Sequence, residues 1–194
     1  MASDDVPDLY PSEPRPVRLM NTIWADKAGT HDALATVGQL DRWVRQCGIP
    51  ATGPLGEDDL LRARELRDAL RRLAATAVND ERPAAVDAGQ AVEHALATLN
   101  GFTSQSTPEL RWDGERGFHR DWRFGVDGFG RELAALALEA GELLSEGPEV
   151  RLGACYGPGC VLYFYRSHPR RGWCSAGCGN RARVARHYRR HANG

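Results

Sequence analysis

Four cysteines near the C-terminal end of this 194-residue chain have the type and spacing of metal ligands. They form two short pairs, Cys155-x4-Cys160 and Cys174-x3-Cys178, with thirteen residues between the pairs. Such pairs are typical of a tetrahedral Zn²⁺ site, because each pair holds the metal from one turn and the spacer brings the two turns together. The spacing therefore predicts one structural zinc ion held by all four thiolates, with inert buried thiols as an alternative.

A second alternative is a pair of disulfides in a secreted protein. The N-terminal segment, MASDDVPDLYPSEP, is acidic and polar and lacks the apolar stretch of a signal peptide. A cytoplasmic location is therefore expected, where disulfides are rare. No apolar run reaches the ~18–20 residues of a membrane span, so no membrane partner is expected.

Charge is divided unevenly along the chain. Residues 1–150 hold all 26 Asp and Glu and 16 of the 25 Lys and Arg, which leaves a formal charge of −10. Residues 151–194 hold the other nine basic residues, all arginines, and no acid, which gives +9. Because four thiolates and one Zn²⁺ add −2, the folded module keeps about +7. This charge predicts a polyanion partner, duplex DNA, with a solvated arginine-rich surface as the alternative.

The elements that must position the cysteines fall into three parts. Residues 1–16 contain four prolines and four acids and are predicted to be a disordered lead-in. Residues 17–147 form a helical domain, which residues 17–24 enter as a short strand or as the first core segment. Residues 147–154 are expected to be a hinge, and residues 151–194 form the zinc module.

Four helices are predicted in the domain. Thr36-Val-Gly-Gln39 has the pattern of a capping box and predicts a helix that buries Trp43 and Cys47 and ends at Gly48. A longer helix over residues 57–78 carries an arginine-rich side that is expected to be solvated and ion-paired. Its arginines are Arg62, Arg64, Arg67, Arg71 and Arg72. The third helix runs from about Pro83 to residues 100–101 and buries Val92, Leu96 and Leu99; the fourth begins near Phe129 and ends near Gly147.

Residues 107–124 alternate apolar and polar side chains on both sides of Asp113-Gly114, which predicts a β-hairpin. In the zinc module, residues 161–165 are expected to form a strand, Ser175 to cap a helix, and residues 177–191 to be that helix. Its apolar side is predicted to pack on the zinc hairpin, and the opposite side is cationic. The apolar side contains Ala182, Val184, Ala185 and Tyr188; the cationic side contains Arg183, Arg186, His187 and Arg190. The fold class is therefore mainly α (α+β), a helical domain with a small β-hairpin followed by a treble-clef-like zinc finger.

The run from Arg170 to Val184 resembles the signature of the CGNR zinc-finger family. In that family four cysteines hold zinc, and the second pair carries motifs that match Trp173-Cys174-Ser175 and Cys178-Gly179-Asn180-Arg181 here. Asn21-Thr22 and the helices around Trp43 and Leu66 are similar to the ABATE domain, the family's N-terminal partner. The resemblance implies a stress-related bacterial transcription regulator that binds DNA through the zinc module and is associated with the nucleoid.

Seven arginines are the candidate DNA contacts, because guanidinium groups match the geometry of phosphate and of guanine acceptors. They are Arg170, Arg171, Arg181, Arg183, Arg186, Arg189 and Arg190. Arg181 has stacking on Trp173 as its alternative, and Asn180 either braces the turn or reads a base. The N-terminal domain is expected to sense a signal, to form a homodimer or to contact partners, and its sequence does not identify a small-molecule ligand.

A zinc-stabilised protein–protein interaction module without DNA binding is the alternative that the basic helix leaves open. An enzyme is not expected, because four thiolates close the coordination shell that a catalytic zinc keeps open. His31, His94 and His119 are scattered, and the chain lacks a nucleophile–base motif and a phosphate-binding glycine loop.

Overall fold

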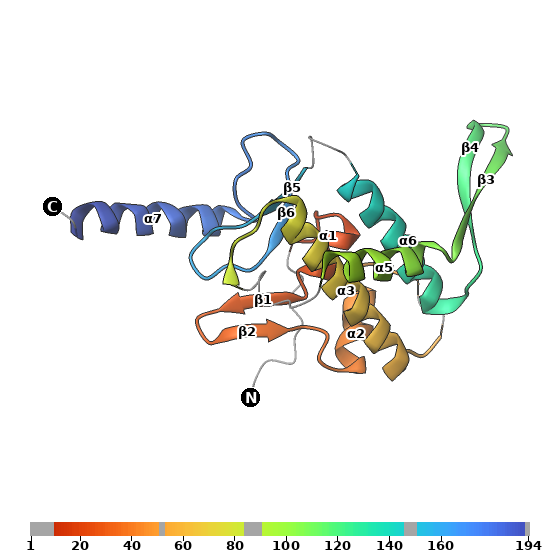
Figure 1. Cartoon of the computed structure of the whole chain (residues 1–194), viewed down its shortest axis with the longest axis horizontal. Coiled ribbons are helices and arrows are strands. Elements are labelled where there is room, and N and C mark those ends of the chain that lie inside the picture. The colour runs from red at the N-terminus through yellow and green to blue at the C-terminus, as the bar shows by residue number, and fades with distance from the viewer. Residues whose placement is uncertain (1–9, 51–52, 84–90, 146–150, 193–194) are drawn as a thin grey trace.

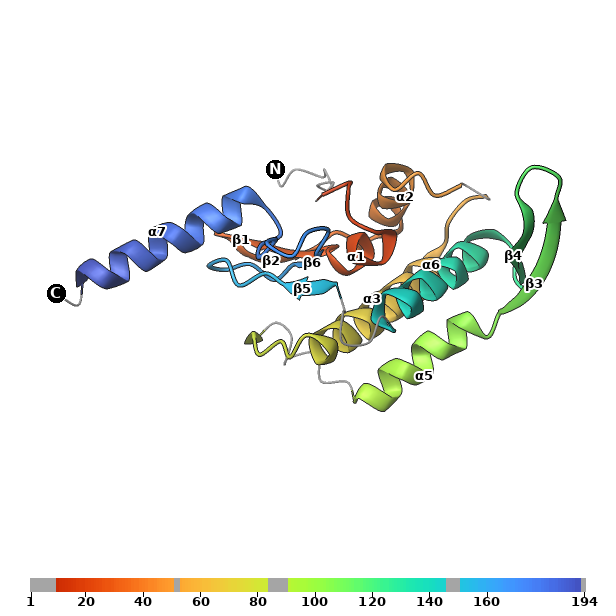
Figure 2. The same ribbon diagram turned by 90° about the horizontal axis from the view of Figure 1, so that it is seen from above.

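The computed structural model describes residues 10–50, 53–83, 91–145 and 151–192. Five described helices form the body: α1 (Arg15–Met20), α2 (Val37–Gln46), α3 (Glu57–Ala77), α5 (Val92–Thr103) and α6 (Gly128–Leu144). Three antiparallel hairpins accompany them: β1–β2 (Ile23–Asp26 and Gly29–Asp32), β3–β4 (Ser106–Asp113 and Gly117–Phe124) and β5–β6 (Leu152–Ala154 and Tyr163–Tyr165). Helix α7 (Ala176–Ala192) extends from one end of the molecule, and the β3–β4 hairpin projects from the other (Figures 1 and 2). The predicted α+β class is confirmed.

Helix α3 is the centre of the body and contacts α1, α2, α5, α6 and β5. Three acids in its first turn complement the positive end of the helix dipole. Leu66, Ala69 and Leu70 on its inner side are almost fully buried. The helix therefore holds the core around which both ends of the chain are arranged.

Helix α2 has the predicted capping box. The Thr36 Oγ1 atom accepts a hydrogen bond from the Gln39 amide at 3.3 Å, and the Gln39 Oε1 atom accepts one from the Thr36 amide at 3.0 Å. Gly48 follows the helix with a φ of +63°, a left-handed conformation that favours glycine. Cys47 packs partly buried against the core, as predicted.

The N-terminal part agrees with the prediction only from residue 17 onwards. Of the two predicted forms, residues 17–20 take that of the first core segment: they lie in helix α1, whose first turn contains Pro16 because the fixed φ angle of proline suits that position. Glu13 is only 5% exposed and Val17 is fully buried. The predicted disordered lead-in is therefore wrong for residues 10–16, and its residues 1–9 lie outside the described part of the chain.

Three further expectations also need correction. Arg67 and Arg71 of α3 are buried instead of solvated. Leu96 of α5 is 44% exposed, and the predicted start of this helix falls partly in residues 84–90, which are not described. The predicted hinge contains strand β5, whose Leu152 is 1% exposed in the main core; its residues 147–150 are not described.

The β3–β4 hairpin has the predicted position, and its pairing runs from Ser106↔Phe124 to Asp113↔Gly117. Among the described residues, no helix combines the length and the apolar character needed to cross a membrane.

Candidate metal centre

The four cysteines predicted as ligands lie together at the junction of β5–β6 and α7. Their sulfur atoms are all within 4.8 Å of one another, and all four residues are buried. Two separations are 3.8 Å (Cys160 to Cys174) and 3.4 Å (Cys174 to Cys178), and none of the four forms a disulfide. A tetrahedron with Zn–S distances of 2.3 Å places its sulfurs about 3.8 Å apart. The donor set and its spacing therefore fit one Zn²⁺, and Zn²⁺ supplies folding energy when it is bound.

The first cysteine turn depends on close backbone approach. A Cβ atom at Gly157 would lie 3.0 Å from the Cβ and 3.2 Å from the Sγ of Cys178, so a side chain there would displace a ligand. Gly159 has a φ of +72°, which lets the turn close on Cys160. The amides of Gly157 and Cys174 donate hydrogen bonds that lower the pKa of Cys155.

The second cysteine turn leads directly into α7. The Ser175 Oγ atom accepts a hydrogen bond from the Cys178 amide at 3.2 Å, which confirms the predicted helix cap. Arg181 Nη2 donates to Cys178 Sγ at 2.9 Å. This contact places a cation beside the thiolate cluster and partly offsets its negative charge.

The closely packed sulfur atoms change one another's acidity. The pKa of Cys155 is lowered, because Cys160 and Cys174 direct hydrogen bonds to its sulfur. Hydrogen bonding with Cys155 raises the pKa of Cys160 and of Cys174. Bound Zn²⁺ would stabilise all four cysteines as thiolates at once.

Arg82 fixes the first cysteine turn from the body. Its Nη1 atom donates to the carbonyls of Cys155 at 3.0 Å, Cys160 at 3.1 Å and Leu162 at 3.2 Å. Its Nε and Nη2 atoms bind the fully buried carboxylate of Asp80 at 2.8 and 2.6 Å. Three carbonyl groups of the finger are therefore held by one guanidinium group of the body.

Tyr163 of β6 completes this network. Its hydroxyl donates to Asp80 Oδ2 at 2.9 Å. Burial, together with the negative charge of Asp80, raises the pKa of Tyr163 to about 12. Burial opposes ionisation of Asp80, but the hydrogen bonds from Arg82 and Tyr163 outweigh it, and the Asp80 pKa lies below its ordinary value.

Arg71 links the same strand to helix α1. Its Nη1 atom donates to the Met20 carbonyl at 2.9 Å and its Nη2 atom to the Val161 carbonyl at 3.4 Å. Its guanidinium lies 5.3 Å from the centre of the Tyr163 ring, within the range of a cation–π contact. Burial lowers the pKa of Arg71.

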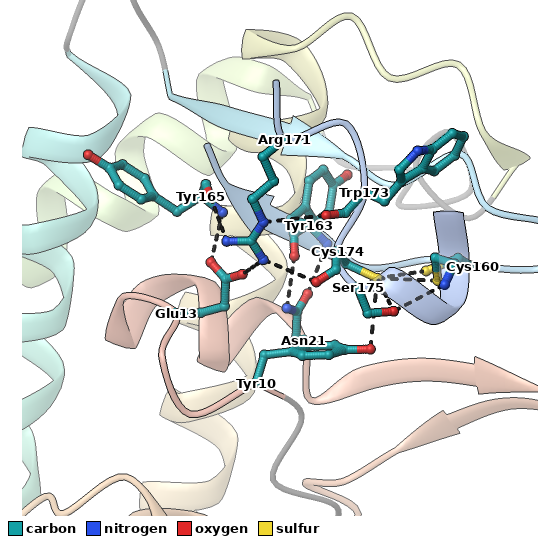
Figure 3. Close-up of polar contacts among 11 residues, drawn as sticks. Tyr10, Glu13, Asn21, Cys160, Tyr163, Tyr165, Arg171, Trp173, Cys174 and Ser175 are labelled. Carbon is teal, nitrogen blue, oxygen red and sulfur yellow. Dashed lines mark hydrogen bonds and ion pairs between the residues drawn. The ribbon is translucent and has the colours of Figure 1, made fainter. Parts of the chain in front are cut away.

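The N-terminal segment binds the other side of the finger (Figure 3). The Asn21 side chain donates to the Tyr163 carbonyl and accepts from its amide, both at 2.9 Å, as a neighbouring strand would. Glu13 accepts a hydrogen bond from the Tyr165 amide at 2.8 Å and forms an ion pair with Arg171. Arg171 also donates to the carbonyls of Tyr165 at 2.8 Å and Cys174 at 3.0 Å.

The finger therefore shares its core with the body. Leu152, Ala154 and Tyr163 belong to the main hydrophobic cluster together with residues of α1, α3 and α6. The cysteine and helix patterns of the sequence do not identify the polar residues that hold the two parts together. They are Glu13, Asn21, Arg71, Asp80 and Arg82. One signal was present, because Arg67 and Arg71 follow Ala63 at intervals of four and thus lie on the buried side of α3.

The predicted DNA contacts divide into two groups. Arg171 binds Glu13 and carbonyls of the finger, Arg181 donates to the sulfur of the ligand Cys178, and we leave both out of the proposed contacts. The other five are exposed: Arg170, Arg183, Arg186, Arg189 and Arg190. Asn180 is exposed and accepts a hydrogen bond from Arg183, so it does not brace the backbone.

The packing predicted for the apolar side of α7 is wrong. Val184 is 54% and Tyr188 is 70% exposed, and only Ala182 is buried. The start of the helix lies at the metal centre, and the remainder extends beyond the finger (Figure 1). The later turns therefore have no surface to pack on.

The fold and the site define a zinc-binding protein in which a helical body and a four-cysteine finger form one unit. Residues 13–147 match the ABATE family, whose description is "Putative stress-induced transcription regulator", and residues 151–191 match the CGNR zinc finger. The chain therefore belongs to the ABATE family and carries a CGNR zinc finger. No curated protein matches the chain.

Proposed function

We propose that the protein is a transcription regulator that binds duplex DNA through the cationic side of α7. The observation that carries this proposal is the exposure of Arg183, Arg186 and Arg190 on one side of a helix that extends from the body. Residues 151–194 contain no acid that could neutralise them. No described acid forms an ion pair with Arg186, Arg189 or Arg190. Ion pairs with the described part of the acidic body therefore do not occupy this side of α7.

The shape and the anchoring of α7 support DNA as the ligand. An α-helix fits the major groove, and arginine side chains pair with phosphate oxygens and with guanine acceptors. Arg189, Arg190 and His191 in the last turn complement the negative end of the helix dipole, which favours a preformed helix in the free protein. The metal centre holds the first turn and thereby sets the direction in which the helix points.

A protein partner is the second candidate function. Val184 and Tyr188 lie four residues apart on the side of α7 that the arginines leave free, and both are exposed. An apolar pair at this spacing is typical of a helix that docks on another protein. On this view the finger is a zinc-stabilised interaction module without DNA binding.

The test is the affinity of the zinc-loaded protein for mixed-sequence duplex DNA across a salt series. We expect micromolar or tighter binding at low salt that falls steeply as salt rises. Arg186→Gln with Arg190→Gln should weaken binding about 10-fold or more and reduce the salt slope by about 2, with zinc retained. Arg45→Gln is the matched control, because Arg45 lies on α2 with its side chain 64% exposed.

Absence of binding at low salt, with zinc in place, would contradict the proposal. An equal loss of affinity in Arg45→Gln would show that the measured binding follows net charge and not the α7 surface. A variant with Val184→Ser and Tyr188→Ser separates the second candidate, because it should leave DNA affinity unchanged and weaken only a protein complex.

A further inference from the structure

The β3–β4 hairpin has two chemically different faces. Residues paired across an antiparallel hairpin share a face, and residues two apart along a strand share it too. Trp112 pairs with Phe118, and Leu110 with Arg120. One face, which we call the apolar arm face, consists of Ser106, Pro108, Leu110, Trp112, Phe118, Arg120, Trp122 and Phe124. Six of these eight residues are apolar.

The other face of the hairpin is charged and satisfies its own charges. Arg123 pairs with Glu109 at 2.7 Å and Arg111 pairs with Asp121 at 3.0 Å. These ion pairs connect the two strands and are exposed to solvent. A face of this kind needs no partner.

The apolar arm face, by contrast, is left open to solvent. Leu110 is 74%, Trp112 is 67% and Phe118 is 72% exposed. The Trp112 and Phe118 rings contact each other, with centroids 4.9 Å apart. The base of the hairpin is tied to the body, where Arg131 of α6 lies over the Phe124 ring at 5.2 Å.

The projection of the hairpin makes this exposure costly. Both views show the hairpin extending beyond the helices, so none of the described helices and strands outside it covers its tip (Figures 1 and 2). A two-stranded hairpin alone is marginally stable in water, and a contiguous exposed apolar patch marks an interaction surface. The apolar arm face therefore requires a partner.

The charge of the hairpin identifies the kind of partner. The eight residues of the apolar arm face carry a single charge, that of Arg120, and no acid. One arginine is too few for nucleic acid, whose binding depends on several phosphate contacts. A two-fold interface places the same surface against itself, so a surface that holds both a cation and aromatic rings is complementary to a second copy. Arg120, the one charged residue of this face, can lie over an aromatic ring of the partner copy.

We propose that the β3–β4 hairpin is a homodimerisation arm, in which the apolar arm faces of two copies of this chain pack against each other. The arm and α7 lie at opposite ends of the molecule in both views. Dimerisation through the arm therefore leaves both α7 helices accessible. The proposal is independent of DNA binding.

Sedimentation of the full-length, zinc-loaded protein over a concentration series tests this arm. The wild type should be a dimer at micromolar concentration. Trp112→Ser with Phe118→Ser should raise the dimer dissociation constant at least about 100-fold, because aromatic residues at the centre of an interface dominate its affinity. Leu110→Thr is a second variant; its β-branched polar side chain keeps the strand and should raise the dimer dissociation constant by removing apolar surface from the interface.

The control carries Arg111→Gln and Arg123→Gln on the charged face and should remain a dimer. Zinc content and far-ultraviolet circular dichroism should stay as in the wild type for every variant, because the arm lies outside the core. A wild type that stays monomeric at about 100 μM would overturn the proposal, as would a dimer unaffected by the apolar variants.

Discussion

Arginines in two regions of this protein have opposite roles. At the junction of finger and body, Arg71, Arg82 and Arg171 donate to backbone carbonyls, and Arg82 and Arg171 also bind buried carboxylates. On α7, Arg186 and Arg190 are exposed and have no ion pair with a described residue. The residue type is the same, so burial and the nearby acceptors decide whether an arginine supports the fold or remains available to a ligand.

The largest effect is expected when a zinc ligand is removed, because this disrupts both the junction of finger and body and the start of α7. Cys174→Ser should release zinc and lower the free energy of unfolding by more than about 4 kcal/mol, because the site contributes folding energy directly. Since Leu152 and Tyr163 belong to the main core, hydrogen exchange in α3 should also become faster. Cys47→Ser is the control and should retain stoichiometric zinc. A body that keeps its native stability and exchange in the Cys174 variant would show that the finger is a separate module.

The next largest effect is expected at Arg82. Arg82→Met leaves the Asp80 carboxylate buried without its cation and removes the donor to three carbonyls of the finger. Breaking a buried pair in this way costs about 3–5 kcal/mol in chemical denaturation. Arg45→Met, which removes a solvent-exposed pair with Asp41, should cost under about 1 kcal/mol. Equal losses for the two variants would contradict the bracing role.

The smallest effects are expected at two adjacent arginines, Arg170 and Arg171, which differ in burial and in their contacts. Arg171→Gln should cost about 1.5–3 kcal/mol, because it leaves Glu13 and the Cys174 carbonyl without a charged donor. Arg170→Gln should leave unfolding nearly unchanged and reduce the salt slope of DNA binding by about 1. Thermal unfolding and DNA titration of both variants measure the two effects. A stability loss in Arg170→Gln together with a reduced salt slope in Arg171→Gln would contradict the roles assigned to the two residues.

Local signals predicted the metal centre and most elements. The cysteine spacing, the Thr36–Gln39 capping box and the Asp113-Gly114 turn each act within a few residues, so the sequence carries their geometry directly. The failures have a different origin. Helical periodicity showed that Val184 and Tyr188 could pack against a surface, but whether a surface lies there depends on the direction of α7. Leu96 is exposed because α5 packs with the side that carries Ala95, Leu99 and Phe102, which leaves Leu96 turned toward solvent.

The contacts between body and finger could not be predicted in this way. Asn21 lies 142 residues from its partner Tyr163, and Glu13 lies 158 residues from Arg171. Polar residues near prolines are typical of a solvated segment. Glu13 is buried because the folded finger covers it and supplies its ion-pair partner, Arg171. Strand β5 was missed because its three residues are too short for periodicity to register.

The long reach of Asn21 has a consequence for biosynthesis. Asn21 leaves the ribosome long before Tyr163, and at 5–20 residues per second the delay is on the order of 10–30 s. Through this interval the nascent body holds Asn21, Arg71 and Asp80 without their finger partners. Folding is therefore completed only when the last fifth of the chain emerges and takes up zinc. A product truncated before Cys155 would leave Asn21 without its partner and Arg71 and Asp80 with only their partners in the body, and we expect it to be more open to proteolysis.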